Sequence, residues 1–111
     1  NYEQALMELQ ILLENYPKSL WAEETKFKII EILYTLNRCP EAREQYRHFN
    51  LEYSNSSYKS EMDFVVASCL EEEGHLQDAY NRFKSLEGNY AYPAILKMKL
   101  VGIEKRIKKK R

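Results

Sequence analysis

The residues of this chain that are suited to chemistry are few, and they stand in no catalytic pattern. His48 and His75 are its two histidines, and the sequence pairs neither with a nucleophile. We interpret both as ordinary surface or turn residues rather than as catalytic or metal-binding groups. The sequence contains no phosphate-binding loop, no GxSxG turn, no HExxH helix and no glycine-rich dinucleotide turn. We therefore predict that the protein is not an enzyme. We expect no metal ion, no cofactor and no small-molecule substrate.

The two cysteines, Cys39 and Cys69, form neither a CxxC pair nor a zinc-binding spacing. Each occupies a position where a small or apolar side chain suits the pattern of its segment. We expect them to be buried free thiols, because unpaired cysteine behaves as a small apolar residue. A disulfide is the alternative.

Charge is spread unevenly along the 111 residues, although the totals of 17 basic and 17 acidic residues cancel. Residues 1–74 are acidic overall, and residues 75–111 are basic. The acidic run Glu71-Glu72-Glu73 is either a solvated helix end or a surface for a partner. The basic groups near the C-terminus are either solvated or contact nucleic acid or an anionic surface. They are Lys97, Lys99, Lys105, Arg106 and residues Lys108–Arg111.

Apolar residues recur every three to four positions along most of the chain, which is typical of amphipathic helices. The pattern predicts helices over residues 2–16, 20–36, 40 to about 53, about 58–73, from about 76 until Gly88-Asn89, and from 94 to about 107. Pro17 ends the first of these, and Ser19 is placed to cap the second. Asn37 and Gly74 are suited to the left-handed conformation that ends a helix. No stretch has the features of a strand, so we predict an all-α fold.

The chain also repeats itself every 37 residues, and we call each set of positions 37 apart a column. The five columns are Ala5/Ala42/Ala79, Leu9/Tyr46/Phe83, Leu12/Phe49/Leu86, Tyr16/Tyr53/Tyr90 and Tyr2/Cys39/Leu76. A fixed period of this length indicates helix pairs stacked as a solenoid. We therefore predict one repeat domain over residues 1–107, followed by a basic tail at 108–111. Because the chain begins at Asn1 and its first methionine is Met7, we expect it to be a piece of a larger protein.

Two segments carry a resemblance to a known family. Residues 70–79 read LEEEGHLQDA and residues 33–42 read LYTLNRCPEA, and both resemble the L-Y-x-x-G-x-Y-x-x-A core of the tetratricopeptide repeat (TPR). The turn Tyr16-Pro17-Lys18-Ser19 resembles the Y-P-x-S turn of bacterial cell-envelope TPR proteins. Those include the Tol-Pal-associated type and the BamD-like outer-membrane assembly lipoproteins. The resemblance implies a right-handed solenoid of about six helices in antiparallel pairs, a protein-binding scaffold, and a periplasmic or cell-envelope location.

The resemblance also implies where a partner binds, since the first helix of each TPR pair lines the concave face. The matching positions here are Glu24, Phe27, Glu31, Tyr34, Glu61, Phe64, Ser68 and Glu71. Their spacings of 3, 4 and 3 keep each set of four on one side of a helix. Carboxylates alternating with aromatics suit a protein or peptide segment that carries Lys or Arg beside apolar residues. The alternative is that Phe27 and Phe64 belong to the core. We expect Glu31 and Glu71 to be exposed.

The first predicted helix lacks the partner that would precede it in a solenoid. We expect Leu6, Ile11, Leu13 and neighbouring residues to present apolar surface there. Either the protein self-associates through this helix, or a preceding segment of the parent protein covers it. The alternative function is a module that binds nucleic acid or an anionic surface through the basic C-terminal groups. We consider nucleic acid the weaker candidate, because no aromatic residues alternate with those basic groups.

Overall fold

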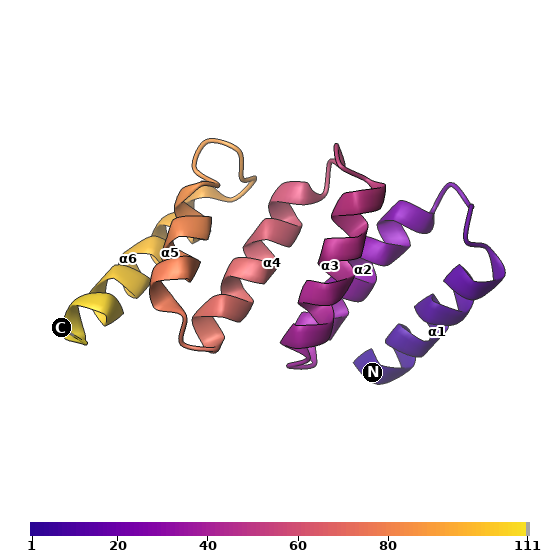
Figure 1. Ribbon diagram of the computed structural model, residues 1–111, viewed down its shortest axis with the longest axis horizontal. Helices are drawn as coiled ribbons and strands as arrows, with labels where there is room; N and C mark the ends of the chain where they lie inside the picture. Colours follow the sequence, from indigo (N-terminus) through magenta and orange to yellow (C-terminus); the bar gives the residue numbers. More distant parts are fainter. Residues whose placement is uncertain (111) are drawn as a thin grey trace. The chain divides into compact units, whose positions relative to one another are not determined.

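The structure is a computed structural model that describes residues 1–110. Within this range it has six α-helices and no strand, which confirms the all-α prediction (Figure 1). The helices are α1 (Tyr2–Asn15), α2 (Ala22–Thr35), α3 (Cys39–Glu52), α4 (Lys59–Glu72), α5 (Leu76–Lys84) and α6 (Pro93–Lys109). The first two residues of the predicted basic tail, Lys108 and Lys109, thus belong to α6. Arg111 lies outside the described residues.

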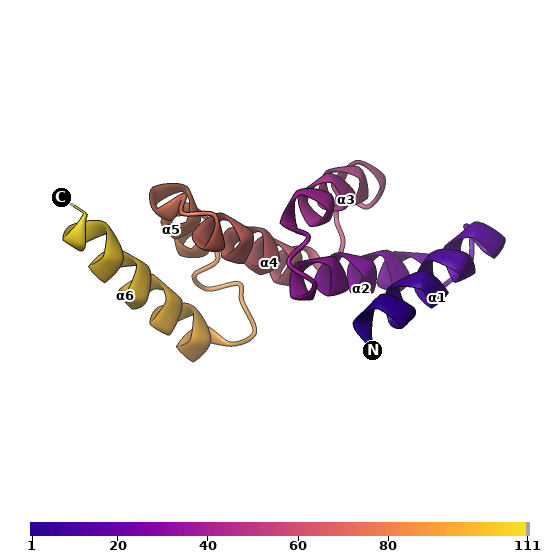
Figure 2. The same cartoon turned by 90° about the horizontal axis from the view of Figure 1, so that it is seen from below.

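The chain divides into two compact units. The first unit comprises residues 1–62 and the second begins at residue 63. In the first unit α1 packs on α2 and α2 packs on α3, and in the second unit α5 packs on α6. Successive helices within each unit run in opposite directions (Figures 1 and 2).

The 37-residue repetition of the sequence is also a repetition of backbone conformation. Tyr16 and Tyr53 end α1 and α3 with similar dihedral angles, φ −135° and ψ 60° for the first, φ −127° and ψ 64° for the second. The same hydrogen bonds, from each N–H to a carbonyl three or four residues earlier, are made by Tyr16, Ser19 and Ala22 and by Tyr53, Ser56 and Lys59. The turn after α1 and the turn after α3 are therefore copies of one conformation.

The ends of α2 and α4 repeat in the same way. Asn37 has φ +60° and Gly74 has φ +86°, so both adopt the predicted left-handed conformation. In each case the next residue donates its N–H to the carbonyl five positions earlier, at 2.8 Å after Asn37 and 2.9 Å after Gly74. These bonds satisfy carbonyls that the helix end would otherwise leave unpaired. Glycine and asparagine are the residues that accept positive φ most readily.

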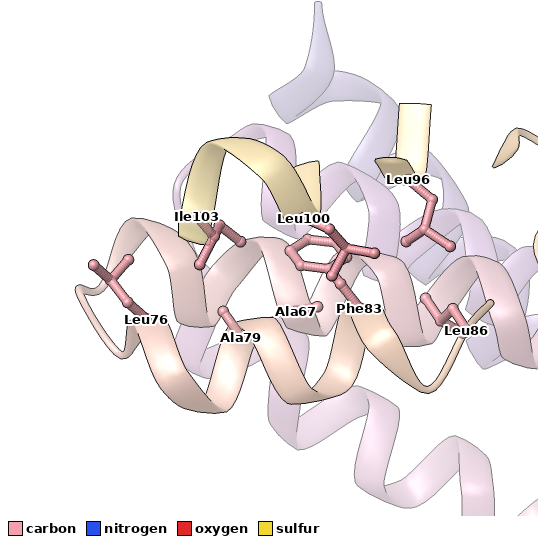
Figure 3. Close-up of a cluster of buried hydrophobic side chains, with 8 residues drawn as sticks. All are labelled: Ala67, Leu76, Ala79, Phe83, Leu86, Leu96, Leu100 and Ile103. Atoms are coloured by element: carbon pink, nitrogen blue, oxygen red, sulfur yellow. The ribbon is translucent and has the colours of Figure 1, made fainter. Parts of the chain in front are cut away.

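Column residues on and just after α3 and α5 lie in the cores of the two units. Ala42, Tyr46 and Phe49 are at most 7% exposed in the first unit, and Ala79, Phe83 and Leu86 are at most 4% exposed in the second. The second core gathers around Phe83, between α4, α5 and α6 (Figure 3). Its buried members are Ala67, Leu76, Ala79, Phe83, Leu86, Leu96, Leu100 and Ile103.

Three expectations need correction. Leu6 is buried and Leu13 is half-buried, so the apolar surface predicted on α1 is smaller than expected, although Ile11 is exposed. Both cysteines are disulfide-bonded rather than free. Ser19 does not cap α2. Its hydroxyl instead accepts a bond from the N–H of Trp21, which precedes the helix, at 3.3 Å.

Candidate partner-binding surface

The eight residues predicted to bind a partner lie on α2 and α4. Those on α2 are Glu24, Phe27, Glu31 and Tyr34, and those on α4 are Glu61, Phe64, Ser68 and Glu71. The first unit contains the four residues of α2 together with Glu61. The remaining three belong to the second unit, so each group is described within its own unit.

An aromatic pair lies at the centre of the first group. The rings of Phe27 and Tyr58 stack with centroids 4.5 Å apart and planes inclined by 14°. Phe27 is only 7% exposed, whereas Tyr58, just before α4, is half-buried. Phe27 is therefore a core residue, in agreement with the alternative interpretation. Tyr58 keeps part of its side chain accessible to a partner.

Three carboxylates act on the Tyr58 phenol. Partial burial is the main reason that the pKa of Tyr58 lies above its ordinary value, and the negative charges of Glu24, Glu23 and Glu61 raise it further. Glu23 and Glu24 occupy the first turn of α2, where the helix dipole favours negative charge. Glu23 also accepts a hydrogen bond from the Ser56 hydroxyl at 2.7 Å. Because the same Ser56 oxygen accepts a bond from the Tyr58 N–H at 3.1 Å, Ser56 links Glu23 to the backbone of Tyr58.

Glu31 extends this acidic region along α2 and is exposed, as predicted. Its pKa lies above the ordinary glutamate value, chiefly because the carboxyl is partly removed from water. Lys28 opposes that shift and Glu61 adds to it. We call the set Glu23, Glu24, Glu31, Tyr58 and Glu61 the Tyr58 surface. Within residues 1–110, no salt bridge involves Glu24, Glu31 or Glu61.

The aromatic side chain of the second group is enclosed by other rings. Phe64 stacks on Tyr90 with centroids 4.7 Å apart and meets the edge of Phe83 at 5.1 Å. Tyr90 in turn contacts Tyr92 edge to face. Phe64 is half-buried and packs against the core around Phe83. Its main role is therefore packing within the second unit.

The other two residues of the second group are also engaged internally. Ser68 is 2% exposed, and its hydroxyl donates to the Phe64 carbonyl at 2.9 Å. Glu71 binds Lys99 at 2.8 Å and Arg106 at 3.0 Å, both from α6, and its side chain is only 16% exposed. The expectation that Glu71 is exposed is therefore wrong. Its carboxylate joins α4 to α6 through these two ion pairs, so its negative charge is already balanced by cations of the same unit.

The predicted residues and the Tyr58 surface overlap in part. Glu24, Glu31 and Glu61 lie on it, and Tyr34 on the same helix is half-buried. Tyr58 and Glu23 were missed. The spacing of Tyr58 from Glu61 could have indicated that the two share a surface, because residues three apart lie on one side of a helix or of its first turn.

This surface contains acceptors and an aromatic ring, but no nucleophile with a positioned base. No group of histidine, cysteine and carboxylate side chains within residues 1–110 is arranged to hold a metal ion. Among the same residues, no helix is long and apolar enough to cross a membrane.

No family model matches the chain, and no curated protein sequence is significantly similar to it.

Proposed function

We propose that the protein is a non-enzymatic scaffold that binds a protein or peptide segment on the Tyr58 surface. One observation carries this proposal. The carboxylates of Glu23, Glu24 and Glu61, from two helices, act on the phenol of a stacked, half-buried tyrosine, and within residues 1–110 no salt bridge involves Glu24, Glu31 or Glu61. Clustered carboxylates repel one another, and a cationic ligand relieves that repulsion.

The ligand that suits this surface has Lys or Arg beside apolar residues. A guanidinium group can pair with a carboxylate through two hydrogen bonds and can also stack on an aromatic face. The Tyr58 ring offers such a face, and Phe27 holds it in place from the other side. The carboxylates steer the ligand and orient it, and the ring supplies contact area.

The wider architecture belongs to the same proposal. The repeated turns after α1 and α3, and after α2 and α4, support a solenoid of TPR-like helix pairs. The resemblance of residues 33–42 and 70–79 supports the TPR family, and that of residues 16–19 supports its cell-envelope members. Disulfide-bonded cysteines are consistent with an oxidising compartment such as the periplasm.

The test is selection from a random peptide library displayed against the folded 111-residue protein. The proposal predicts enrichment of Lys or Arg next to aromatic or aliphatic residues, and binding that weakens with added salt. A library that yields no enriched sequence would contradict the proposal. So would enrichment of acidic or uncharged sequences.

The alternative function, binding of nucleic acid or an anionic surface through α6, is tested in parallel. Two of its predicted cations, Lys99 and Arg106, are already bound to Glu71, which reduces the positive charge available to phosphates. A gel-shift series with random oligonucleotides and a flotation assay with anionic vesicles give the comparison. Strong binding that falls steeply with salt in either assay would favour the alternative.

A further inference from the structure

The first helix leaves open a face that its two counterparts bury. The column residues on α3 and α5, such as Ala42, Phe49 and Phe83, are at most 2% exposed because those helices pack on α2 and α4. The equivalent α1 residues have no such cover. Leu12 is 41% exposed, and Ala5 and Leu9 are only half-buried. We call this side of α1 the column face.

The last helix leaves open the complementary face. Helix α4 begins at Lys59 and α6 begins at Pro93, 34 residues later. At that offset, Phe64 and Ala67 of α4, which pack against α5, correspond to Met98 and Val101 of α6. Yet Met98 is 74% exposed and Val101 is 44% exposed. The face that α4 uses to bind its partner helix is therefore uncovered on α6.

This uncovered face is a groove of about 460 Å³. It is lined by Ala94, Lys97, Met98, Val101, Gly102 and Lys105. A methyl group added at Gly102 would meet nothing within 4 Å, and small residues such as glycine and alanine let another helix approach closely. The apolar stripe flanked by lysines suits an amphipathic helix of opposite charge.

Charge identifies such a helix within the same chain. Helix α1 has three glutamates and no lysine or arginine, and of the three Glu8 borders the column face, whereas Glu3 is paired with Arg38. Helix α6 has six basic residues and a single glutamate, and Lys97 and Lys105 line its groove. Pairing α1 with a second α1, or α6 with a second α6, brings like charges together. Pairing α1 with α6 brings opposite charges together.

We propose that the column face of α1 in one copy docks in the α6 groove of another copy. The contact repeats between copies the packing of α3 on α2 and of α5 on α4 within the chain. It joins two different surfaces, so each bound copy still offers one free α1 and one free α6. Association therefore continues into chains, or closes as a ring if the rotation permits. The inference uses surfaces other than the Tyr58 surface and does not depend on the proposed function.

Sedimentation of the full 111-residue chain at increasing concentration gives the first measurement. The average mass should rise beyond that of a dimer and fall again at high salt. Leu12→Lys on α1 and Val101→Glu on α6 should each weaken self-association by roughly tenfold or more. Both positions are partly exposed, so the helical circular dichroism should be retained. Met98→Glu provides a second α6 variant should Val101→Glu lose helicity.

Matched controls separate the effect of charge from the effect of position. Met7→Lys makes the same charge change as Leu12→Lys, but at an exposed residue on the opposite side of α1. Asn89→Glu places a negative charge in the exposed loop before α6. Both controls should self-associate like the parent chain.

Mixing the two interface variants gives the decisive result. The Val101→Glu chain retains its α1 face and the Leu12→Lys chain retains its α6 groove, so together they should form a one-to-one complex that grows no further. The proposal is overturned if the parent chain stays monomeric at about millimolar concentration, a range in which even weak contacts are populated. It is also overturned if Val101→Glu and Met98→Glu self-associate as strongly as the parent, because a contact between two α1 helices would then explain the association.

Discussion

The two units use the carboxylates of their helices in opposite ways. In the first unit, the charges of Glu24 and Glu61 raise the pKa of Tyr58, and within residues 1–110 no salt bridge involves either of them. In the second unit, the carboxylate of Glu71 is bound by Lys99 and Arg106. The first unit thus keeps negative charge at a surface that a partner can reach. In the second unit, the negative charge of Glu71 forms ion pairs that join α4 to α6.

This difference shows that a repeated sequence does not give a repeated site. The cores of the two units match column by column. The chemistry of each surface, however, depends on the side chains that the neighbouring residues contribute. Helix α6 supplies cations to Glu71, and the residues around α2 supply Tyr58 instead. Charge reversals should therefore affect folding in the second unit and ligand binding in the first.

The largest effect on stability should come from Glu71→Lys. The substitution removes two ion pairs and places a third cation beside Lys99 and Arg106, which should cost about 2–3 kcal/mol of unfolding free energy. Glu61→Lys, the same charge reversal in the first turn of α4 and on the Tyr58 surface, should change that free energy by less than about 0.5 kcal/mol. Urea unfolding at neutral pH compares them. Equal losses would remove the proposed distinction between the units.

The next largest effect on stability should come from overpacking either core, and it tests whether the two cores are alike. Ala42 and Ala79 are both fully buried, so replacement of either by leucine should cost about 1–3 kcal/mol through overpacking. Ala5, in the same column on α1, is only half-buried and should tolerate leucine far better. Thermal unfolding of the three variants tests this. An unchanged melting temperature for Ala42→Leu would show that the 37-residue register is wrong.

A smaller effect is expected at Glu31. Its folded pKa lies above the ordinary value of 4.5, so the folded chain holds the proton more tightly than the unfolded chain. Stability attributable to this group is therefore greatest at low pH and falls as pH rises from about 4.5 through the folded pKa. At pH 7, Glu31→Gln should stabilise the protein by only a few tenths of a kcal/mol, because the group is exposed.

Urea unfolding at pH 7 and at about pH 3.5 measures that difference, since below the ordinary pKa both side chains are neutral. The advantage of glutamine should disappear at the lower pH. An advantage of the same size at both pH values would mean that burial of charge is not its cause.

The smallest effect concerns ionisation of one phenol. Burial and the nearby carboxylates raise the pKa of Tyr58 above 10.0. Removing a negative charge by Glu24→Gln should lower that pKa towards the ordinary value. The phenolate absorbance of each chain, minus that of its Tyr58→Phe variant, isolates this tyrosine from the other eight. An unchanged pKa of Tyr58 in the Glu24→Gln variant would show that the Glu24 charge does not act on this ring.

Sequence alone predicted the helices and the core well, because both depend on local signals. Apolar spacing located all six helices, Asn37 and Gly74 marked two helix ends, and the columns marked the buried residues Ala42 and Ala79. The predictions failed where the state of a residue depends on contacts with residues far away in the sequence. Nothing in the spacing of Cys39 and Cys69 indicates whether either is bonded.

The candidate site shows the same limit. Helical spacing places Phe27, Ser68 and Glu71 on particular sides of α2 and α4, but it does not show what covers those sides. The cations that bind Glu71 come from 28 and 35 residues further along the chain. Only the folded arrangement shows that Ser68 is buried and that Tyr58 lies over Phe27.

The central claim is that the Tyr58 surface binds basic, partly apolar segments. Its most direct test is the double variant Glu24→Lys plus Glu61→Lys, titrated with the strongest library peptide at two salt concentrations. The control, Glu14→Lys plus Asp78→Lys, makes the same change in net charge at exposed residues outside the surface. We expect the Tyr58-surface variant to keep its fold, to lose about tenfold or more in affinity, and to respond less to salt, while the control binds like the parent chain. A folded double variant that binds the peptide with parental affinity and salt dependence would contradict the account.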